Sequence, residues 1–240
     1  MLPEPLRPKA KVEPEIKSLI LGFGHRARSG KDTAVATIVE RRGSQYPGHL
    51  SSDYKGPFYD ARAYSFARAL KEEVTAAALN AGGMDRLCNP EMEFYQENGN
   101  FIKLPEWVVF EPDAPMDDPL CPLGKQRTLL QWWGTEFRRN VNPNYWVDRL
   151  AEIISKEQPQ VALISDMRFP NEKEFVEKHG YSIRVDRNNL PSLSGSAGVH
   201  ASELALADVP DWDWGAILKN YSTLEEFKAK AVKLFDSLAS

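Results

Sequence analysis

Gly22-Phe-Gly-His-Arg-Ala-Arg-Ser-Gly-Lys-Asp-Thr33 is the most informative stretch of this sequence. It follows an apolar run at 18–23 that is typical of a buried strand, and it leads into a segment of helical composition at 31–42. A phosphate-binding loop needs small residues whose backbone N–H groups face inward, a helix N-terminus behind them, and a lysine for the β and γ phosphates. The stretch contains all three, so it predicts a site for a nucleoside triphosphate.

Within this stretch the individual roles follow from residue type. The predicted ATP-binding residues are Arg28, Ser29, Gly30, Lys31, Asp32 and Thr33. Lys31 would meet the phosphates, and the Thr33 hydroxyl is a candidate ligand for Mg²⁺. The pattern departs from the usual one in two places, because His25 stands where the first glycine is expected and Asp32 separates Lys31 from the hydroxyl residue.

A dinucleotide-binding loop is the competing interpretation, since Gly22-x-Gly24-x-x-Ala27 resembles the Rossmann fingerprint. That fingerprint requires an acidic residue at the end of a second strand about 20 residues further on. The chain there is still in the segment 31–42 or just past it, and Lys31 would have no role. The phosphate loop is therefore favoured over an oxidoreductase.

The order of the other predicted elements indicates an α/β fold. Apolar runs predict further strands at 63–66, 161–165, 181–185 and 216–218. Composition predicts helices at 67–81, 128–141, 144–156 and 172–178, and the capping box Ser222-Thr-Leu-Glu225 opens a last one. Strands that alternate with helices form mostly parallel sheets with helices on both faces. We therefore expect a P-loop NTPase-type parallel sheet sandwiched by helices.

The segment 84–125 interrupts this alternation with prolines, acids and aromatic residues. It predicts an irregular, lid-like insertion with one short hairpin around 101–110, although a surface elaboration explains it equally well. A Ser/Gly/Pro-rich loop at 188–200 is a second candidate lid. Residues 1–17 are predicted to be a flexible N-terminal tail, and 18–240 a single P-loop domain.

Composition restricts the class of protein. The 240 residues are 42% hydrophobic and 27% charged, which excludes a mainly disordered chain. The net charge of −4 argues against broad binding to nucleic-acid backbone. The N-terminus lacks the apolar core of a signal peptide, no run approaches the roughly 18 apolar residues of a membrane span, and Cys88 and Cys121 form no CxxC pair. We expect a cytoplasmic protein without nucleic-acid or membrane partners.

Asp166 and Arg168 form the second candidate site, directly after the apolar run 161–165. A carboxylate at the C-terminal end of a buried parallel strand faces the ligand crevice, and in phosphate-loop enzymes such a carboxylate holds the metal or its water. Arg168 could reach a phosphoryl group in transfer. The structural alternative is that the two residues pair with each other or cap the next helix.

Two helical patterns suggest where a second ligand would bind. At helical spacing, Leu130, Trp133, Phe137 and Val141 form a core stripe, and Gln131, Thr135, Arg138 and Asn142 form a neighbouring polar one. This polar stripe could contact a base and a phosphate, or it could be a solvated flank. Arg68 and Lys71 share a face in a first helical turn. The helix dipole disfavours cations at this end of a helix, so their presence favours an anionic ligand, with ordinary surface charge as the alternative.

In this order, the motifs resemble those of the phage deoxynucleoside monophosphate kinases. The resembling segments are Arg28-Ser-Gly-Lys-Asp-Thr33, Ser65-Phe-Ala-Arg-Ala-Leu-Lys71, Leu130-Gln-Trp-Trp-Gly-Thr-Glu136, Trp146, Asp166-Met-Arg-Phe-Pro-Asn-Glu172, His200-Ala-Ser-Glu203 and Asn220-Tyr-Ser-Thr-Leu-Glu-Glu226. They span roughly residues 18–235. The insertion 84–125 contains no motif of this family, so the resemblance does not indicate which bases are accepted.

The resemblance implies transfer of the γ-phosphoryl group of ATP, with Mg²⁺, to a deoxynucleoside monophosphate. It implies that Lys31 and Thr33 hold ATP·Mg²⁺, and that Lys31, Asp166 and Arg168 are catalytic, with Thr33 and Asp166 at the metal. The implied monophosphate site comprises Arg68, Lys71, Gln131, Thr135, Arg138, Arg139 and Trp146. It also suggests host cytoplasm as the location and leaves a homodimer open.

The expected mechanism needs no general base, because the acceptor phosphate is already ionised near neutral pH. Positioning and charge neutralisation should carry catalysis. Two alternatives to the nucleotide kinase remain: a kinase on the same scaffold with a non-nucleotide phosphorylated acceptor, and a nucleotide-gated binding module.

Overall fold

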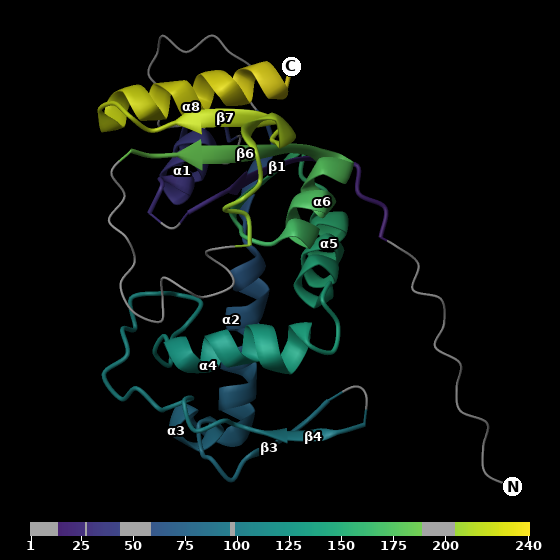
Figure 1. Ribbon diagram of the computed structural model, residues 1–240, viewed down its shortest axis with the longest axis vertical. Helices are drawn as coiled ribbons and strands as arrows, with labels where there is room; N and C mark the ends of the chain where they lie inside the picture. Colours follow the sequence, from purple (N-terminus) through teal and green to yellow (C-terminus); the bar gives the residue numbers. More distant parts are fainter. Residues whose placement is uncertain (1–13, 27, 44–58, 97–98, 189–204) are drawn as a thin grey trace, which may run out of the picture.

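A five-stranded sheet, parallel at every pairing, is the centre of the computed structural model, which describes residues 14–26, 28–43, 59–96, 99–188 and 205–240 (Figure 1). The strand order is β2-β5-β1-β6-β7. The strands are β1 (Leu19–Gly24), β2 (Ala61–Tyr64), β5 (Val161–Met167), β6 (Gly180–Asp186) and β7 (Ala216–Lys219). The predicted α/β fold with a mostly parallel sheet is thus confirmed.

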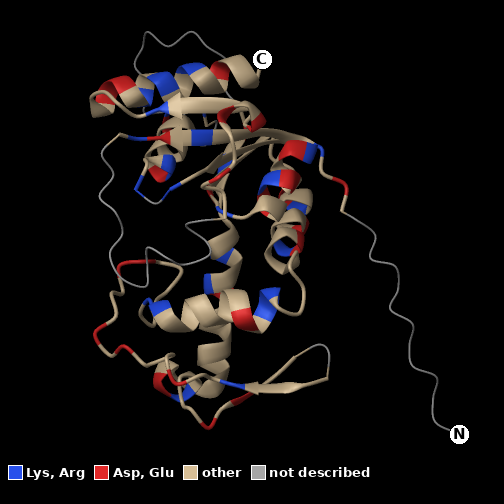
Figure 2. Cartoon of the chain, viewed as in Figure 1, with Lys and Arg blue, Asp and Glu red and all other residues tan. Residues whose placement is uncertain are grey.

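Helices cover both faces of the sheet. The described helices are α1 (Lys31–Arg42), α2 (Phe66–Ala81), α3 (Met84–Leu87), α4 (Arg127–Trp132), α5 (Tyr145–Glu157), α6 (Pro170–His179) and α8 (Leu224–Leu238), of which α3 and α4 pack against α2 away from the sheet (Figure 1). A π-helix (Trp133–Arg139) continues α4, and a 3₁₀ turn (Asp211–Asp213) precedes β7. Figure 2 shows acidic and basic residues intermixed along α6 and α8, which is the pattern of ordinary solvated helix faces.

Burial on both faces explains why the strands are continuous apolar runs. Leu21 and Leu163 pack on one face against Ile38 of α1 and Phe227 of α8. The other face of the same strands packs against α5 and α6, and their core residues there include Ile20, Ile164, Ile154 and Val176. A Cβ at Gly22 would lie 2.6 Å from Cγ2 of Val176, so only glycine permits this approach of α6 to β1.

The segment 84–125 builds a second group of elements at the far end of α2 (Figure 1). Its hairpin pairs β3 (Glu93–Tyr95) with β4 (Phe101–Lys103), so the hairpin expected around 101–110 begins earlier in the chain. Phe94 explains the position, because it is buried against Trp132, Trp133 and Phe137. The hairpin therefore fastens the insertion to α4 and the π-helix.

Several predicted boundaries shift by a few residues. The strand predicted at 63–66 ends at Tyr64, because Ser65 accepts the N–H of Arg68 and so caps α2. The last capping box lies one residue later than predicted, between Thr223 and Glu226. Most of the predicted tail 1–17 and of the loop 188–200 lies outside the described residues. No helix among the described residues is long and apolar enough to cross a membrane.

Candidate functional site

The loop between β1 and α1 encloses a buried lysine. Gly30 takes φ +111°, and a Cβ there would lie 2.7 Å from Nδ2 of Asn220, which donates to the Ser29 carbonyl at 2.8 Å. Lys31 is 6% exposed, and its Nζ donates to the carbonyls of His25 at 3.1 Å and Arg26 at 2.6 Å. The lysine is therefore held inside the loop, at the N-terminus of α1.

His25 takes the left-handed backbone conformation, with φ +89°. This conformation costs a non-glycine residue about 1–2 kcal/mol. Burial, with the charges of Arg184 and Arg26, lowers the pKa of its imidazole to about 4, so the ring is neutral near pH 7. The loop thus keeps the path that a glycine would take, although the residue is a histidine.

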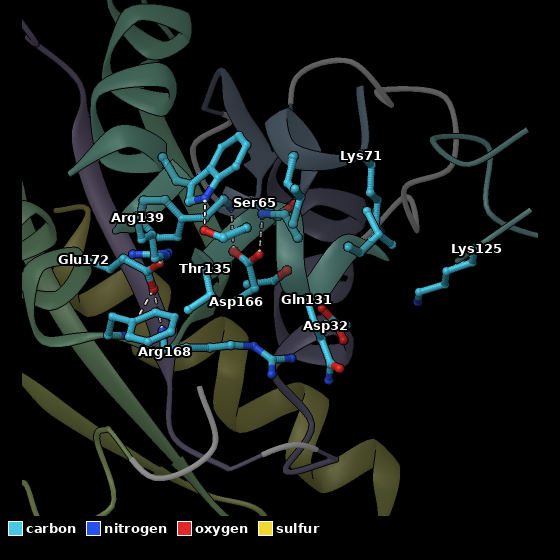
Figure 3. Close-up of a pocket in the computed structure, with 18 residues that line it drawn as sticks. Asp32, Ser65, Lys71, Lys125, Gln131, Thr135, Arg139, Asp166, Arg168 and Glu172 are labelled. Carbon is cyan, nitrogen blue, oxygen red and sulfur yellow. Dashed lines mark hydrogen bonds and ion pairs between the residues drawn. The ribbon is translucent and has the colours of Figure 1, made fainter. Parts of the chain in front are cut away.

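A cavity of about 400 Å³ adjoins this loop through Asp32, in the first turn of α1 (Figure 3). Eight of the predicted site residues line it: Asp32, Lys71, Gln131, Thr135, Arg139, Trp146, Asp166 and Arg168. They come from α1, α2, α4, the π-helix, α5 and the end of β5. Figure 3 shows Arg139 and Glu172 on one side of this pocket and Lys71 and Lys125 on the opposite side, with Asp166 between them.

Asp166 lies near the C-terminal end of β5, next to β1. Its Oδ1 accepts the N–H of Phe66 and its Oδ2 the N–H of Ala67, each at 2.8 Å, so the carboxylate caps α2 rather than the helix that follows it in sequence. Burial raises the pKa of Asp166, these two hydrogen bonds oppose the rise, and the nearby Asp32 charge adds to it. Asp32 and Asp166 therefore place two carboxylates at one pocket.

Glu172 is a pocket residue to which the sequence assigns no role. It is 1% exposed and accepts hydrogen bonds from Nη2 of Arg139 at 2.5 Å, the N–H of Arg168 at 2.7 Å and the N–H of Phe169 at 3.1 Å. Burial raises the pKa of this carboxyl to about 7, against the opposing charge of Arg139. The sequence feature that could have identified Glu172 is its position in the first turn of a helix that starts at Pro170, where a glutamate commonly accepts backbone N–H groups.

The π-helix determines which polar side chains of 127–139 face the pocket. A π-helix forms i to i+5 hydrogen bonds, as from Asn140 N–H to the Thr135 carbonyl at 3.0 Å, and this changes the angular spacing of the residues. Gln131, Thr135 and Arg139 line the pocket, whereas Arg138 does not. The α-helical stripe that grouped Arg138 with Thr135 is therefore wrong.

Comparison with known proteins supports the resemblance. No family model matches the sequence. A deoxynucleoside-5′-monophosphate kinase of Escherichia phage T5 is 26% identical over 185 residues, which cover 67% of this chain and 72% of that protein. A putative deoxynucleotide monophosphate kinase of Acanthamoeba polyphaga mimivirus is 28% identical over 124 residues, 46% of this chain and 61% of that protein.

The chain is similar to viral deoxynucleoside monophosphate kinases. The resemblance that the sequence motifs indicated is thereby confirmed. The alignment with the mimivirus protein leaves more than a third of that relative unmatched.

Two residues assigned by resemblance to the monophosphate site of such a kinase lie outside the pocket. Nε of Arg68 pairs with Oε1 of Glu72 at 2.8 Å on the surface of α2. Arg138 pairs with Glu73 at 2.6 Å, and its guanidinium lies 4.3 Å from the ring centroid of Phe137. The other predicted loop residues, Arg28, Ser29, Gly30, Lys31 and Thr33, do not line the pocket.

The other pocket-lining residues, absent from the predicted site, are Ser65, Phe66, Ala67, Leu70, Lys125, Leu130, Gly134, Ser165, Phe169 and Glu172. Most of these residues form the walls of the pocket, and they lie together only because helices distant in sequence pack against one another. Among the described residues, no group of three or more His, Cys, Asp or Glu side chains could hold a metal ion. Oxygen donors are nevertheless present in Thr33, Asp32 and Asp166, and Mg²⁺ usually takes its other ligands from phosphates and water.

Proposed function

We propose that this chain transfers the γ-phosphoryl group of ATP to a deoxynucleoside 5′-monophosphate and releases ADP and the deoxynucleoside diphosphate. The main support for this proposal is the pocket of about 400 Å³, which lies between the N-terminus of α1 and the end of β5. Its volume suits a small ligand, and its cations suit an anionic one. The similarity to viral deoxynucleoside monophosphate kinases supports a phosphotransferase acting on nucleotides.

The loop Arg28 to Thr33 is proposed to bind the ATP phosphates. Lys31 would exchange the carbonyls of His25 and Arg26 for phosphate oxygens. The buried Ser29 hydroxyl has no hydrogen-bond partner among the residues that the structure describes, which suits a loop built to meet a ligand. Thr33 and Asp166 would hold Mg²⁺, which when bound neutralises charge on the phosphate oxygens.

The acceptor monophosphate is proposed to occupy the pocket. Lys71 and Arg139 would neutralise its phosphate from opposite sides, with Gln131 and Thr135 as further hydrogen-bonding groups. Trp146 is 2% exposed and donates its indole N–H to the Gly134 carbonyl at 2.9 Å, so it forms a rigid wall.

The transfer itself is an in-line displacement. An ionised acceptor oxygen forms a bond to the γ-phosphorus while the bond from that phosphorus to the β,γ-bridging oxygen breaks, and ADP leaves with the electron pair. No proton needs to be removed, so no general base is required. Arg168, which lines the pocket and whose charge acts on Asp166, would neutralise charge that moves between these oxygens.

The test is a panel of the deoxynucleoside monophosphates with ATP and Mg²⁺, with ADP and the diphosphate product measured. Lys31→Ala should lower turnover about 10²–10³-fold, as expected for the loss of one preorganised charge. Lys103→Ala is the control, because Lys103 is 52% exposed on β4. Full activity in folded Lys31→Ala protein would refute the assignment. Turnover only with non-nucleotide phosphates, or ATP hydrolysis without an acceptor, would favour the two alternatives.

A further inference from the structure

An ion pair joins the insertion to a lysine of the pocket. Lys71, on α2, lines the pocket, and its Nζ lies 2.8 Å from Oδ2 of Asp118 in the insertion. Both side chains are 18% exposed, so the pair is more shielded from solvent than an ordinary surface salt bridge. An ammonium has three donors, and Asp118 uses one of them. Lys71 is thus anchored at the pocket and still able to bind an anion.

Asp118 is itself held by its surroundings. Its Oδ1 accepts the N–H of Leu120 at 3.0 Å, and the Leu120 carbonyl accepts the hydroxyl of Thr75 at 3.2 Å. Thr75 lies one helical turn after Lys71 on α2, so the segment 118–120 is fastened to one face of that helix at two points.

The same segment belongs to a loop that brings a second cation to the pocket. The side chain of Gln126 forms two hydrogen bonds with the main chain of Glu111, at 2.7 and 2.9 Å, and the N–H of Lys125 donates to the Pro115 carbonyl at 3.0 Å. The loop 111–126 is therefore closed at its base, and Lys125 lines the pocket from there. Two turns connect the segment 118–120 to this lysine, because the N–H of Cys121 donates to the Asp118 carbonyl at 2.8 Å and the N–H of Gly124 to the Cys121 carbonyl at 3.0 Å, so displacement of the segment would disturb Lys125.

We propose that Asp118 is a positioning residue for the acceptor: it fixes the Lys71 ammonium at the pocket and holds in place the loop that carries Lys125. This inference rests on the proposed function, because it assumes a monophosphate in the pocket. A phosphate monoester carries a charge of about −1.5 to −2 at pH 7, so two fixed cations suit it better than mobile ones. Asp118 acts through the lysines and does not itself contact the substrate.

The test compares Asp118→Asn and Asp118→Ala with Asp117→Asn, an exposed neighbouring carboxylate. Asp118→Asn keeps the shape of the side chain, so it guards against a folding defect in the alanine variant. Both Asp118 variants should raise the KM and the Kd for the deoxynucleoside monophosphate about tenfold, or about 1.4 kcal/mol, and leave kcat and the KM for ATP within about twofold. Asp117→Asn should leave all four values unchanged.

A double-mutant cycle with Lys71→Met tests whether Asp118 acts through Lys71. In the Lys71→Met background, Asp118→Asn should raise the KM by less than about threefold, with the remainder transmitted through Lys125. A full tenfold effect in that background would overturn the proposal. So would a lower KM in Asp118→Asn, which would make Asp118 a competitor for Lys71, or lower stability with unchanged Kd, which would make the pair merely structural.

Binding measured by tryptophan fluorescence separates this inference from the proposed function. If the wild-type chain binds a monophosphate but does not phosphorylate it, the proposed function fails, and the Asp118 effect on Kd still decides the inference. If it binds no deoxynucleoside monophosphate at all, both fail.

Discussion

Arg139→Met should destabilise the protein by an amount that depends strongly on pH. The side chains of Arg139 and Glu172 are 13% and 2% exposed, and Nη2 of Arg139 lies 2.5 Å from Oε1 of Glu172. Breaking a buried ion pair from one side typically costs about 3–5 kcal/mol, because the other charge is left uncompensated. Here that charge is a carboxylate whose pKa burial has already raised to about 7.

The sign of the pH effect follows from linkage. Because the folded-state pKa of Glu172 lies above its unfolded value of 4.5, the folded state binds more protons, and stability from this group is lost as pH rises from 4.5 through 7. Without Arg139 the folded-state pKa of Glu172 rises further. At pH values above the raised pKa, each additional pKa unit lowers the free energy of unfolding by about 1.4 kcal/mol. Because Glu172 takes up a proton once its pKa exceeds the pH, the pH-dependent part of the loss in Arg139→Met is limited to about 2 kcal/mol at pH 8.5, and the total loss there should be about 3 kcal/mol. At pH 5.5 Glu172 is protonated, and only about 1 kcal/mol from the stacking of Arg139 on Phe169 should be lost.

The assay is urea denaturation of wild type, Arg139→Met and Arg139→Met/Glu172→Gln between pH 5.5 and 8.5. The difference between variants cancels the titration of groups that both share, including His25. The double variant removes both charges, so most of the stability lost at pH 8.5 should return. Arg149→Met is the matched control, since Arg149 and Glu152 are 52% and 37% exposed and such pairs contribute about 1 kcal/mol or less. An Arg139→Met loss of equal size at both pH values would refute this reasoning.

Three further substitutions test other parts of the site. Asp166→Asn should lower stability by about 1–3 kcal/mol in urea denaturation, because the amide can accept only one of the two N–H groups of α2. The variant should also transfer phosphoryl groups more slowly in the kinase assay, and full activity would contradict the proposed role of Asp166. His25→Gly should be more stable than His25→Ala by about 1 kcal/mol, the reverse of the usual order, because φ is +89° there; thermal unfolding of the pair decides it. Arg138→Met should reduce stability by about 2 kcal/mol through its lost bond to Glu73 and leave the KM for the monophosphate unchanged, whereas a raised KM would return Arg138 to the pocket.

The strand–loop–helix around Lys31 and the position of Asp166 could be predicted because they depend on local rules. A strand, a loop with Gly30-Lys31 and a helix are contiguous in sequence. The C-terminal ends of parallel strands meet at one edge of a sheet, and β1 and β5 are neighbours there. These rules need no knowledge of how distant helices pack.

The walls of the pocket depend on tertiary packing, and the sequence predicted them less well. Helical periodicity assumes 3.6 residues per turn, but the chain forms a π-helix over Trp133–Arg139, so the periodicity selected Arg138 and the resemblance alone supplied Arg139. Glu172 acquires its partner from 33 residues upstream, where no local pattern points to a contact. Its burial is a consequence of α6 packing near the π-helix.

Asp166 links the two halves of the pocket in a way that no single motif reveals. One carboxylate lies at the same pocket as Asp32, which follows the β1–α1 loop, and also receives the first two N–H groups of α2, 99 and 100 residues away in sequence. Since α2 carries Lys71, this cap helps to set how far that ammonium lies from the phosphate loop. Loss of activity in an Asp166 variant could then arise at the proposed Mg²⁺ site or from movement of α2. Amide hydrogen exchange distinguishes these causes, because the lost hydrogen bond speeds exchange at Phe66 or Ala67 in either case, whereas only loosening of α2 also speeds exchange further along the helix, around Lys71.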